Sequence, residues 1–236
     1  MRKTIKKLFF GKQGDITPDQ NSINHLTRRR KNVSSIWNND HQNDFGIEKI
    51  VRLILASCHF LFPGIYIKHF AESIHPHYKD LSVDLMVILK LVLPICILYF
   101  GFQDVEALVY LQVYLSMETL LQVPTLIFAS DAFSKPISYS RSMILVFLNY
   151  MEILLALAVV YAHGHYLNHE FAHWFDPIYY SFMVGSTIGF GDYYPVTLFG
   201  KVLSSFQAIL FFLYVVLFMS YFNNKIEQSN YFDPDK

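Results

Sequence analysis

The stretch STIGFGDYYPVT, residues 186–197, places Gly189 and Gly191 one residue apart and directly before Asp192. Glycine adopts positive φ values at no steric cost, so this spacing permits a backbone that other residues disfavour. The chain around it is strongly apolar, since 53% of its 236 residues are hydrophobic and 17% are aromatic. Irregular backbone at membrane depth is tolerated only where protein buries it or where it lines water. Residues 187–191 are therefore predicted to line something wet.

A second motif, HEFAH at residues 169–173, fits the pattern H-E-x-x-H. On a helix, this spacing lets His169 and His173 bind zinc while the glutamate acts as a base, which would make a membrane metalloprotease. No third ligand stands at a familiar spacing. Two other interpretations stay open: a group of histidines that senses metal or protons, and plain solvated residues in a connection between membrane helices. The histidines concerned are His163, His165, His169 and His173.

A short helix is predicted to position the glycines. Asp176 followed by Pro177 is typical of a helix start, with an N-capping side chain and then a residue whose missing N–H costs nothing in the first turn. The helix that follows, Pro177–Ser186, is far too short to cross a bilayer. Residues 177–197 are therefore expected to enter the membrane from one side and return.

Four stretches are long and apolar enough to span a membrane: residues 50–67, 85–102, 143–161 and 198–222. Arg52 lies near one end of the first stretch, where its charge can snorkel to the surface. Residues 105–129 are ambiguous, because a segment of sufficient length carries several polar residues. These are Glu106, Gln112, Glu118, Thr119 and Gln122.

The distribution of basic residues bears on that segment. Residues 1–31 are rich in lysine and arginine, and Lys135 and Arg141 precede residue 143, so both regions are predicted to be cytoplasmic. An even number of crossings must then separate them. We therefore favour a helix at the inner membrane surface, or a re-entrant one, for residues 105–129. Five crossings with an outside N-terminus form the alternative.

Three charged residues stand inside apolar stretches: Lys90, Glu118 and Glu152. They are predicted to form structural pairs, or else to mark a regulatory site. Cys58 and Cys96 also lie in apolar stretches and are expected to be packing residues rather than a disulfide or metal pair. The first residues are basic and polar, so no cleavable signal peptide is expected.

The sequence TIGFGD, residues 187–192, resembles the selectivity filter of potassium channels, whose usual form is T-V-G-Y-G-D. The resemblance covers residues 143–222 and implies an all-α integral membrane protein with a pore-loop potassium channel fold of outer helix, pore helix, filter and inner helix. Two or three further transmembrane or membrane helices would precede it. The expected regions are a basic cytoplasmic arm (1–47), N-terminal membrane helices and connection (48–142), the pore domain (143–222) and a short cytoplasmic tail (223–236).

The resemblance also implies roles for individual residues. Carbonyl oxygens of the filter and the Thr187 hydroxyl would bind ions, and four chains would complete each ring. Ile188 and Phe190 stand where valine and tyrosine are commoner, and Phe190 lacks the hydroxyl that would anchor the filter. The expected filter residues are Thr187, Ile188, Gly189, Phe190 and Gly191, and the expected supporting residues are Asp192, with an aromatic cuff of Tyr179 and Tyr180.

The sequence thus predicts a homotetrameric, potassium-selective channel rather than an enzyme. It would be a multi-pass protein of the cell membrane, plasma or inner, with K⁺ ions and the lipid bilayer as partners, no cofactor and no nucleic acid. A non-selective cation channel is the nearer alternative. The membrane zinc metalloprotease that uses residues 169–173 is the alternative of a different class.

Overall fold

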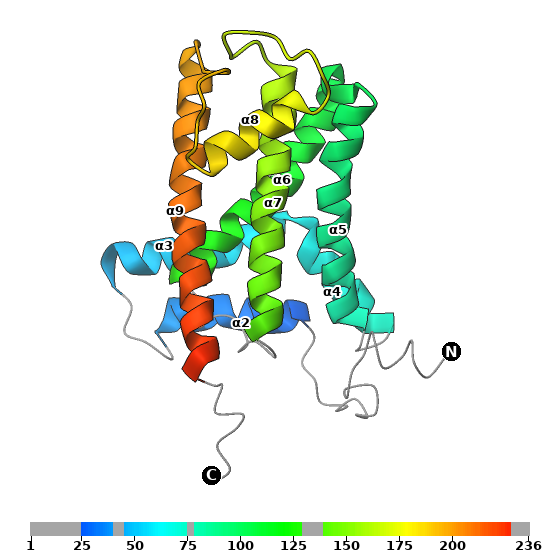
Figure 1. Cartoon of the computed structure of the whole chain (residues 1–236). Coiled ribbons are helices and arrows are strands. Elements are labelled where there is room, and N and C mark those ends of the chain that lie inside the picture. The colour runs from blue at the N-terminus through cyan, green and yellow to red at the C-terminus, as the bar shows by residue number, and fades with distance from the viewer. Residues whose placement is uncertain (1–24, 40–44, 75–77, 129–138, 228–236) are drawn as a thin grey trace, which may run out of the picture. The chain divides into compact units, whose positions relative to one another are not determined.

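The computed structural model describes residues 25–39, 45–74, 78–128 and 139–227 (Figure 1). The predicted all-α fold is confirmed: the described residues form helices, and the β-type pairing found among them is an isolated bridge between Leu167 and Pro195. The helices are α2 (His25–Asn38), α3 (Gly46–Cys58), η2 (His59–Leu61), α4 (Pro63–Ile74), α5 (Tyr78–Tyr99), η3 (Phe102–Asp104), α6 (Glu106–Phe128), α7 (Tyr139–His163), α8 (Asp176–Gly185) and α9 (Leu198–Glu227).

The chain divides into two compact units. The first comprises residues 1–88 and 124–133, and the second comprises residues 89–123 and 134–236. Most of the predicted basic arm, residues 1–24, lies outside the described residues, while α2 begins at His25. The end of the predicted tail, residues 228–236, also lies outside them, and α9 extends past residue 222 to Glu227.

Three helices within the described residues are long and apolar enough to cross a membrane, and they match three of the predicted spans. They are Leu81–Tyr99, Ser140–His163 and Leu198–Ser220. The remaining predicted span, 50–67, falls on two arms, Gly46–Leu61 (α3 with η2) and Pro63–Ile74 (α4), which are long and apolar enough only as a pair and are bent by 64°. The chain is extended at Phe62, directly before Pro63, because the proline ring disfavours helical backbone in the preceding residue. Arg52 does not snorkel from this pair: it is buried in α3.

The prediction of a helix at the inner membrane surface, or a re-entrant one, for residues 105–129 stays a prediction, since α6 is not among the three apolar helices above. In the second unit, hydrogen bonds connect α6 and the turn before it to α7. The Gln103 carbonyl, just before α6, is 2.9 Å from Nδ1 of His163 at the C-terminal end of α7. Further along, the Thr119 hydroxyl donates to Glu152 near the middle of α7 over 2.7 Å.

The polar residues in the middle of α6 share one face of the helix. Gln112, Ser116 and Thr119 recur at helical spacing and are all buried. Tyr110 and Met117 are exposed on the other side. Polar residues count against a helix that lipid surrounds, but here they are buried in protein, and the Thr119 hydroxyl bonds to Lys90 of α5 and Glu152 of α7. Composition alone could not reveal that orientation.

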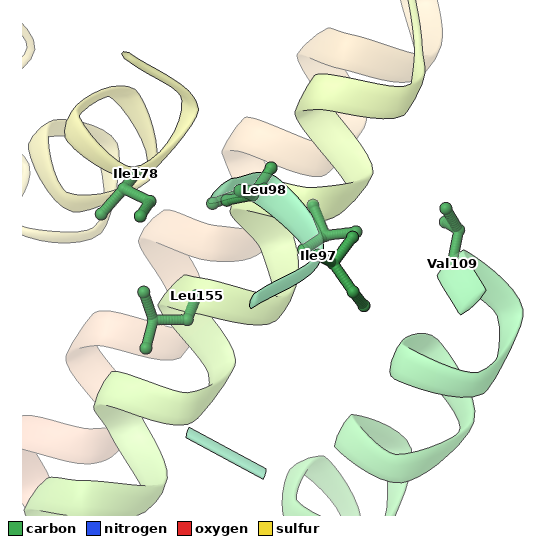
Figure 2. Packing of buried hydrophobic residues seen from close by; sticks show 7 residues of the cluster. Ile97, Leu98, Val109, Leu155 and Ile178 are labelled. Atoms are coloured by element: carbon green, nitrogen blue, oxygen red, sulfur yellow. The ribbon is translucent and has the colours of Figure 1, made fainter. Parts of the chain in front are cut away.

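An apolar cluster holds the second unit together (Figure 2). Ile97 and Leu98 of α5 and Val109 of α6 pack with α7 residues that include Leu155, and Ile178 adds a contact from α8. Lipid tails are as apolar as these side chains, so such packing stabilises a membrane protein through close van der Waals contact rather than through the hydrophobic effect. The cluster therefore fixes α8 against α5 and α7.

The part of the second unit that carries the glycines consists of α7, α8 and α9. Figure 1 shows α7 and α9 running in opposite directions with the short α8 crossing between them. The predicted short helix is confirmed with bounds one residue earlier, Asp176–Gly185. The segment 186–197 follows α8 and leads directly into α9.

Candidate functional site

The start of α8 differs in detail from the prediction. Asp176 is the first helical residue rather than the N-cap, and the N-cap residue Phe175 makes no side-chain capping bond. The Asp176 carboxylate accepts hydrogen bonds from the backbone N–H groups of Ala172 (3.0 Å) and His173 (2.8 Å), and from the Tyr193 hydroxyl (3.3 Å). Asp176 therefore ties the loop before α8 to the loop that follows residues 187–191.

The backbone after α8 directs its N–H groups back to the helix. Thr187 N–H donates to the Val184 carbonyl over 3.0 Å, and Ile188 and Gly189 N–H both donate to the Met183 carbonyl over 3.0 and 3.2 Å. These bonds satisfy carbonyls that the end of a helix leaves without partners. Within the described residues, no hydrogen bond is accepted by the carbonyls of residues 187–190.

The sign of φ alternates along the same stretch. It is positive at Thr187 (59°), Gly189 (52°) and Gly191 (86°), and negative at Ile188 and Phe190 between them. A Cβ atom built on Gly189 or Gly191 meets nothing within 4 Å, so a side chain would fit sterically at both positions. Glycine is favoured at these positions because of the positive φ. For Thr187, a β-branched residue, the left-handed conformation is strained. The segment therefore adopts a conformation that glycines make accessible, with exposed side chains.

The two predicted cuff tyrosines have different surroundings. Desolvation raises the pKa of the Tyr179 phenol, and so do its hydrogen bond to Asp192 and the negative charge of that carboxylate. Tyr180 is buried instead, with its hydroxyl 3.1 Å from Oγ of Ser204 on α9. Its ring makes an edge contact with Tyr161 of α7 at 4.8 Å between centroids. The structure thus brings Tyr179 to Asp192 and places Tyr180 behind α8.

A buried polar cluster behind α8 escaped the sequence reasoning. Gln207 of α9 donates through Nε2 to the carbonyl (2.6 Å) and the hydroxyl (2.9 Å) of Ser181, and its Oε1 accepts from the Tyr161 hydroxyl (3.0 Å). Ser181 in turn donates to the Leu154 carbonyl of α7 over 2.6 Å. The signal was present, because Gln207 is an amide in the middle of an otherwise apolar span. These contacts join α7, α8 and α9.

Asn168 was also missed, since it lies in a loop without a recognisable motif. Its amide donates to the Asp192 carbonyl (3.1 Å), and its side-chain oxygen accepts from the Tyr194 N–H (2.9 Å). Its own N–H donates to the Tyr194 carbonyl over 3.0 Å. The Leu167–Pro195 bridge extends this pairing. The loop before α8 thus holds the chain where it leaves residues 187–191.

Gly185 closes α8 at a tight helix crossing. A Cβ atom on Gly185 would lie 2.3 Å from Cδ2 of Leu154, 3.1 Å from the Tyr150 hydroxyl and 3.2 Å from Nε2 of Gln207. The Tyr150 hydroxyl also donates a hydrogen bond to the Gly185 carbonyl. The lack of a side chain therefore lets α8 end directly against α7 and α9.

The zinc hypothesis requires His169 and His173 to lie on one face of a helix, and the structure does not show this. His169 and His173 lie in the loop before α8 rather than on a helix, and the described residues contain no group of three or more metal-ligating side chains. His173 accepts from the Phe175 N–H (3.3 Å), while Nδ1 of His165 lies 3.4 Å from the exposed carboxylate of Glu170. The geometry offers no support for the metalloprotease reading.

Residues 142–228 match a family model described as Ion channel. This region is similar to an ion channel domain. No curated protein and no solved structure matches the chain. The matched residues contain most of α7, all of α8, the 186–197 segment and α9, so the similarity to an ion channel domain covers the part that carries the alternating φ values. Together with the three apolar helices, the match indicates a multi-pass integral membrane protein.

Proposed function

We propose that this protein conducts potassium ions passively across the cell membrane, as a homotetramer whose filter is residues 187–191. One observation carries the proposal: the backbone N–H groups of residues 187–189 bond to α8, while the carbonyls of residues 187–190 accept no hydrogen bond within the described part of the chain. Carbonyl oxygens without partners are the ligands that replace the hydration shell of a potassium ion.

The alternating φ values support the same reading. A row of ion-coordinating carbonyls requires backbone that passes repeatedly through the left-handed region, and positive φ recurs here at every second residue from Thr187 to Gly191. Replacing the usual valine and tyrosine by Ile188 and Phe190 leaves the backbone ligands in place. The ion sites therefore depend on main-chain oxygens that these side chains do not supply.

The proposed homotetramer is supported by the incomplete ion sites and the exposed apolar side chains of a single chain. One strand supplies oxygens on one side of an ion only, so a complete ring needs several copies. In one chain, Ile188 is 54% exposed and Phe190 is 70% exposed. On α9, Ile209 and Phe212 are exposed as well. Apolar groups of this size beside a water-filled path favour packing against neighbouring copies.

The experiment is ion flux through the purified protein in liposomes, with potassium and sodium gradients compared and barium added. We expect potassium-selective flux that barium blocks and that Gly189→Ala abolishes, because alanine disfavours a φ of 52°. Gly101→Ala is the matched control: Gly101 has a φ of 70° and open space around a built Cβ, but it lies between α5 and η3. Both substitutions place alanine at a positive φ and should cause a similar backbone strain. We therefore expect Gly189→Ala to abolish flux and Gly101→Ala to keep it.

Each outcome has a distinct meaning. Equal sodium and potassium flux would replace the selective channel by a non-selective cation pore. Flux that survives Gly189→Ala would contradict the assignment of the filter. If neither gradient drives flux under any condition, conduction fails, and proteolysis in the wild type and in Glu170→Gln is then the remaining test of residues 169–173.

A further inference from the structure

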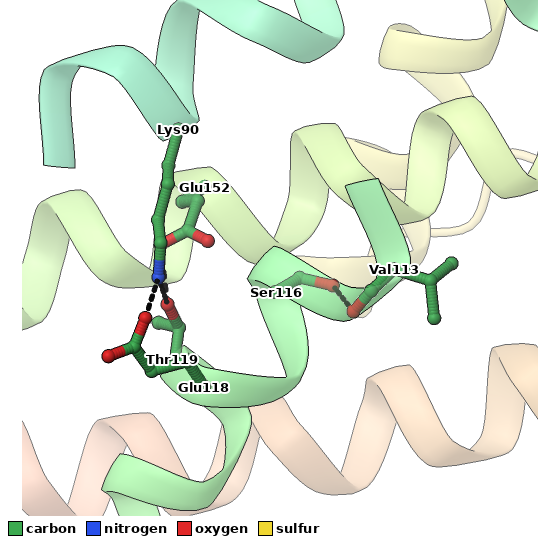
Figure 3. A network of polar contacts seen from close by, with 6 residues as sticks. All are labelled: Lys90, Val113, Ser116, Glu118, Thr119 and Glu152. Carbon is green, nitrogen blue, oxygen red and sulfur yellow. Dashed lines mark hydrogen bonds and ion pairs between the residues drawn. The ribbon is translucent and has the colours of Figure 1, made fainter. Parts of the chain in front are cut away.

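A buried charged cluster joins α5, α6 and α7 (Figure 3). Nζ of Lys90 on α5 donates to the Glu118 carboxylate over 3.1 Å and to the Thr119 hydroxyl over 3.2 Å, both on α6. The Thr119 hydroxyl donates to Oε2 of Glu152 on α7 over 2.7 Å. Lys90 is about 14 Å along the helix axis from Tyr99, which places the cluster near the middle of a bilayer about 30 Å thick.

The charges of this cluster do not balance. Lys90 contributes one positive charge, whereas Glu118 and Glu152, if both are ionised, contribute two negative charges. Lys90 is 6% exposed and Glu152 is fully buried. An uncompensated charge at this depth is costly, and proteins remove it by pairing or by protonation. One added proton makes the cluster neutral.

The hydrogen bonds show where that proton belongs. The Thr119 oxygen accepts from Lys90, so its single proton is directed to Oε2 of Glu152, which must act as the acceptor. The other oxygen, Oε1, is buried and has no hydrogen-bond partner among the described residues. A proton on Oε1 leaves every bond in Figure 3 intact and turns an unsatisfied acceptor into a donor.

A potential acceptor lies on α9. Tyr214 of α9 is 5% exposed, and its hydroxyl also lacks a hydrogen-bond partner among the described residues. Its electrostatic neighbours are Glu152 and Tyr150 of α7. The groups that bear on Glu152 are thus Lys90, Glu118 and Thr119, with Tyr214 facing it from α9.

We propose that Glu152 is a proton-binding site inside the membrane, which takes one proton from bulk water on Oε1 and thereby couples α5 and α6, through Tyr214, to the α9 helix of the channel domain. With the proton bound, the cluster is neutral and Glu152 has a donor to offer to the Tyr214 oxygen. With the proton released, the cluster carries one negative charge next to α9. Protonation thus changes both the charge and the hydrogen-bond donor that Glu152 presents to Tyr214 of α9.

The test is the pH dependence of flux in liposomes, and this readout rests on the proposed conduction. We expect wild-type flux to follow a one-proton curve, with the protonated-to-deprotonated ratio changing about tenfold per pH unit. Glu152→Gln, a neutral mimic of the protonated state, should fix the flux at the wild-type acid level at every pH. His165→Gln is the matched control, because His165 is highly exposed and lies beside Glu170, outside the charged cluster, and it should leave the curve unchanged.

Two further variants separate a proton site from a structural role. Glu118→Gln removes a neighbouring negative charge, so the midpoint of the curve should move to lower pH, by about one unit or more. Lys90→Met removes the positive charge and should move the midpoint in the opposite direction. A structural role alone predicts altered stability without these opposed shifts, so unmoved midpoints would overturn the proposal even if Glu152→Gln fails to fold.

A second readout does not depend on conduction. The infrared difference spectrum between acid and alkaline pH should contain the carbonyl stretch of a buried protonated carboxylic acid, and this band should be lost in Glu152→Gln. A wild-type spectrum without the band, or with a band that the substitution leaves in place, overturns the proton site. The band without flux at any pH would instead support the proton site and count against conduction.

Discussion

Replacement of Gln207 by leucine tests whether the polar cluster behind α8 holds the channel domain together. Gln207 is fully buried and makes three hydrogen bonds, two to Ser181 and one from the Tyr161 hydroxyl. Leucine has a similar volume, so the substitution removes these bonds without opening a large cavity. The expected result is a loss of stability set by the hydrogen bonds alone.

The size of the loss follows from those three bonds. Hydrogen bonds between membrane helices contribute about 0.6 kcal/mol each on average, which gives about 2 kcal/mol for the set. The groups left behind keep other partners: the Ser181 hydroxyl still donates to the Leu154 carbonyl, and the Tyr161 hydroxyl still lies 3.2 Å from Oγ of Ser204. Little additional cost from unsatisfied groups is therefore expected.

The assay is equilibrium unfolding of the purified protein in mixed micelles, titrated with a denaturing detergent and followed by tryptophan fluorescence. Ser205→Ala is the control, because Ser205 is an exposed residue of the same helix that bonds only to the Lys201 carbonyl among the described residues. It should change the free energy of unfolding by less than about 0.5 kcal/mol. The reasoning is refuted if Gln207→Leu is as stable as Ser205→Ala.

Two other predictions concern the surroundings of residues 187–191. Gly185→Ala should lower the free energy of unfolding by about 1–3 kcal/mol because its Cβ would lie 2.3 Å from Leu154 Cδ2; the same titration measures this, and Leu154→Ala in the same chain should recover part of the loss. Asn168→Ala removes the two side-chain hydrogen bonds to the chain beyond residues 187–191 and keeps the backbone one, so the potassium-to-sodium flux ratio should fall while the fold persists. An unchanged flux ratio would show that Asn168 does not support the filter.

Local chemistry explains which parts of the site could be predicted from sequence. The Asp176–Pro177 pair starts a helix within a residue of the predicted position, because a proline without an N–H belongs in a first turn. Positive φ at Gly189 and Gly191 likewise follows from residue type. The exact role of Asp176 did not follow, since its carboxylate binds N–H groups of the preceding loop, which only the folded chain brings within reach.

Two elements show what composition alone does not record. The break between α3 and α4 at Phe62 was readable from Pro63, yet the apolar composition of residues 50–67 outweighed it. The polar residues of α6 counted against a helix in contact with lipid, but Gln112 and Thr119 are buried in protein. Composition averages over all faces of a helix, whereas the cost of a polar group depends on the one face that it occupies.

By itself, the sequence determined the membrane character of the chain, the three apolar helices and the glycine-bearing segment after a short helix, because each depends on residues close together along the chain. Only the tertiary structure decided which polar groups meet. Lys90 and Glu118 are far apart in sequence from Glu152, and Asn168 is far from Asp192, yet each set is in hydrogen-bond contact. A buried polar group is costly without a partner, and helix packing that no local pattern records decides which partner it meets.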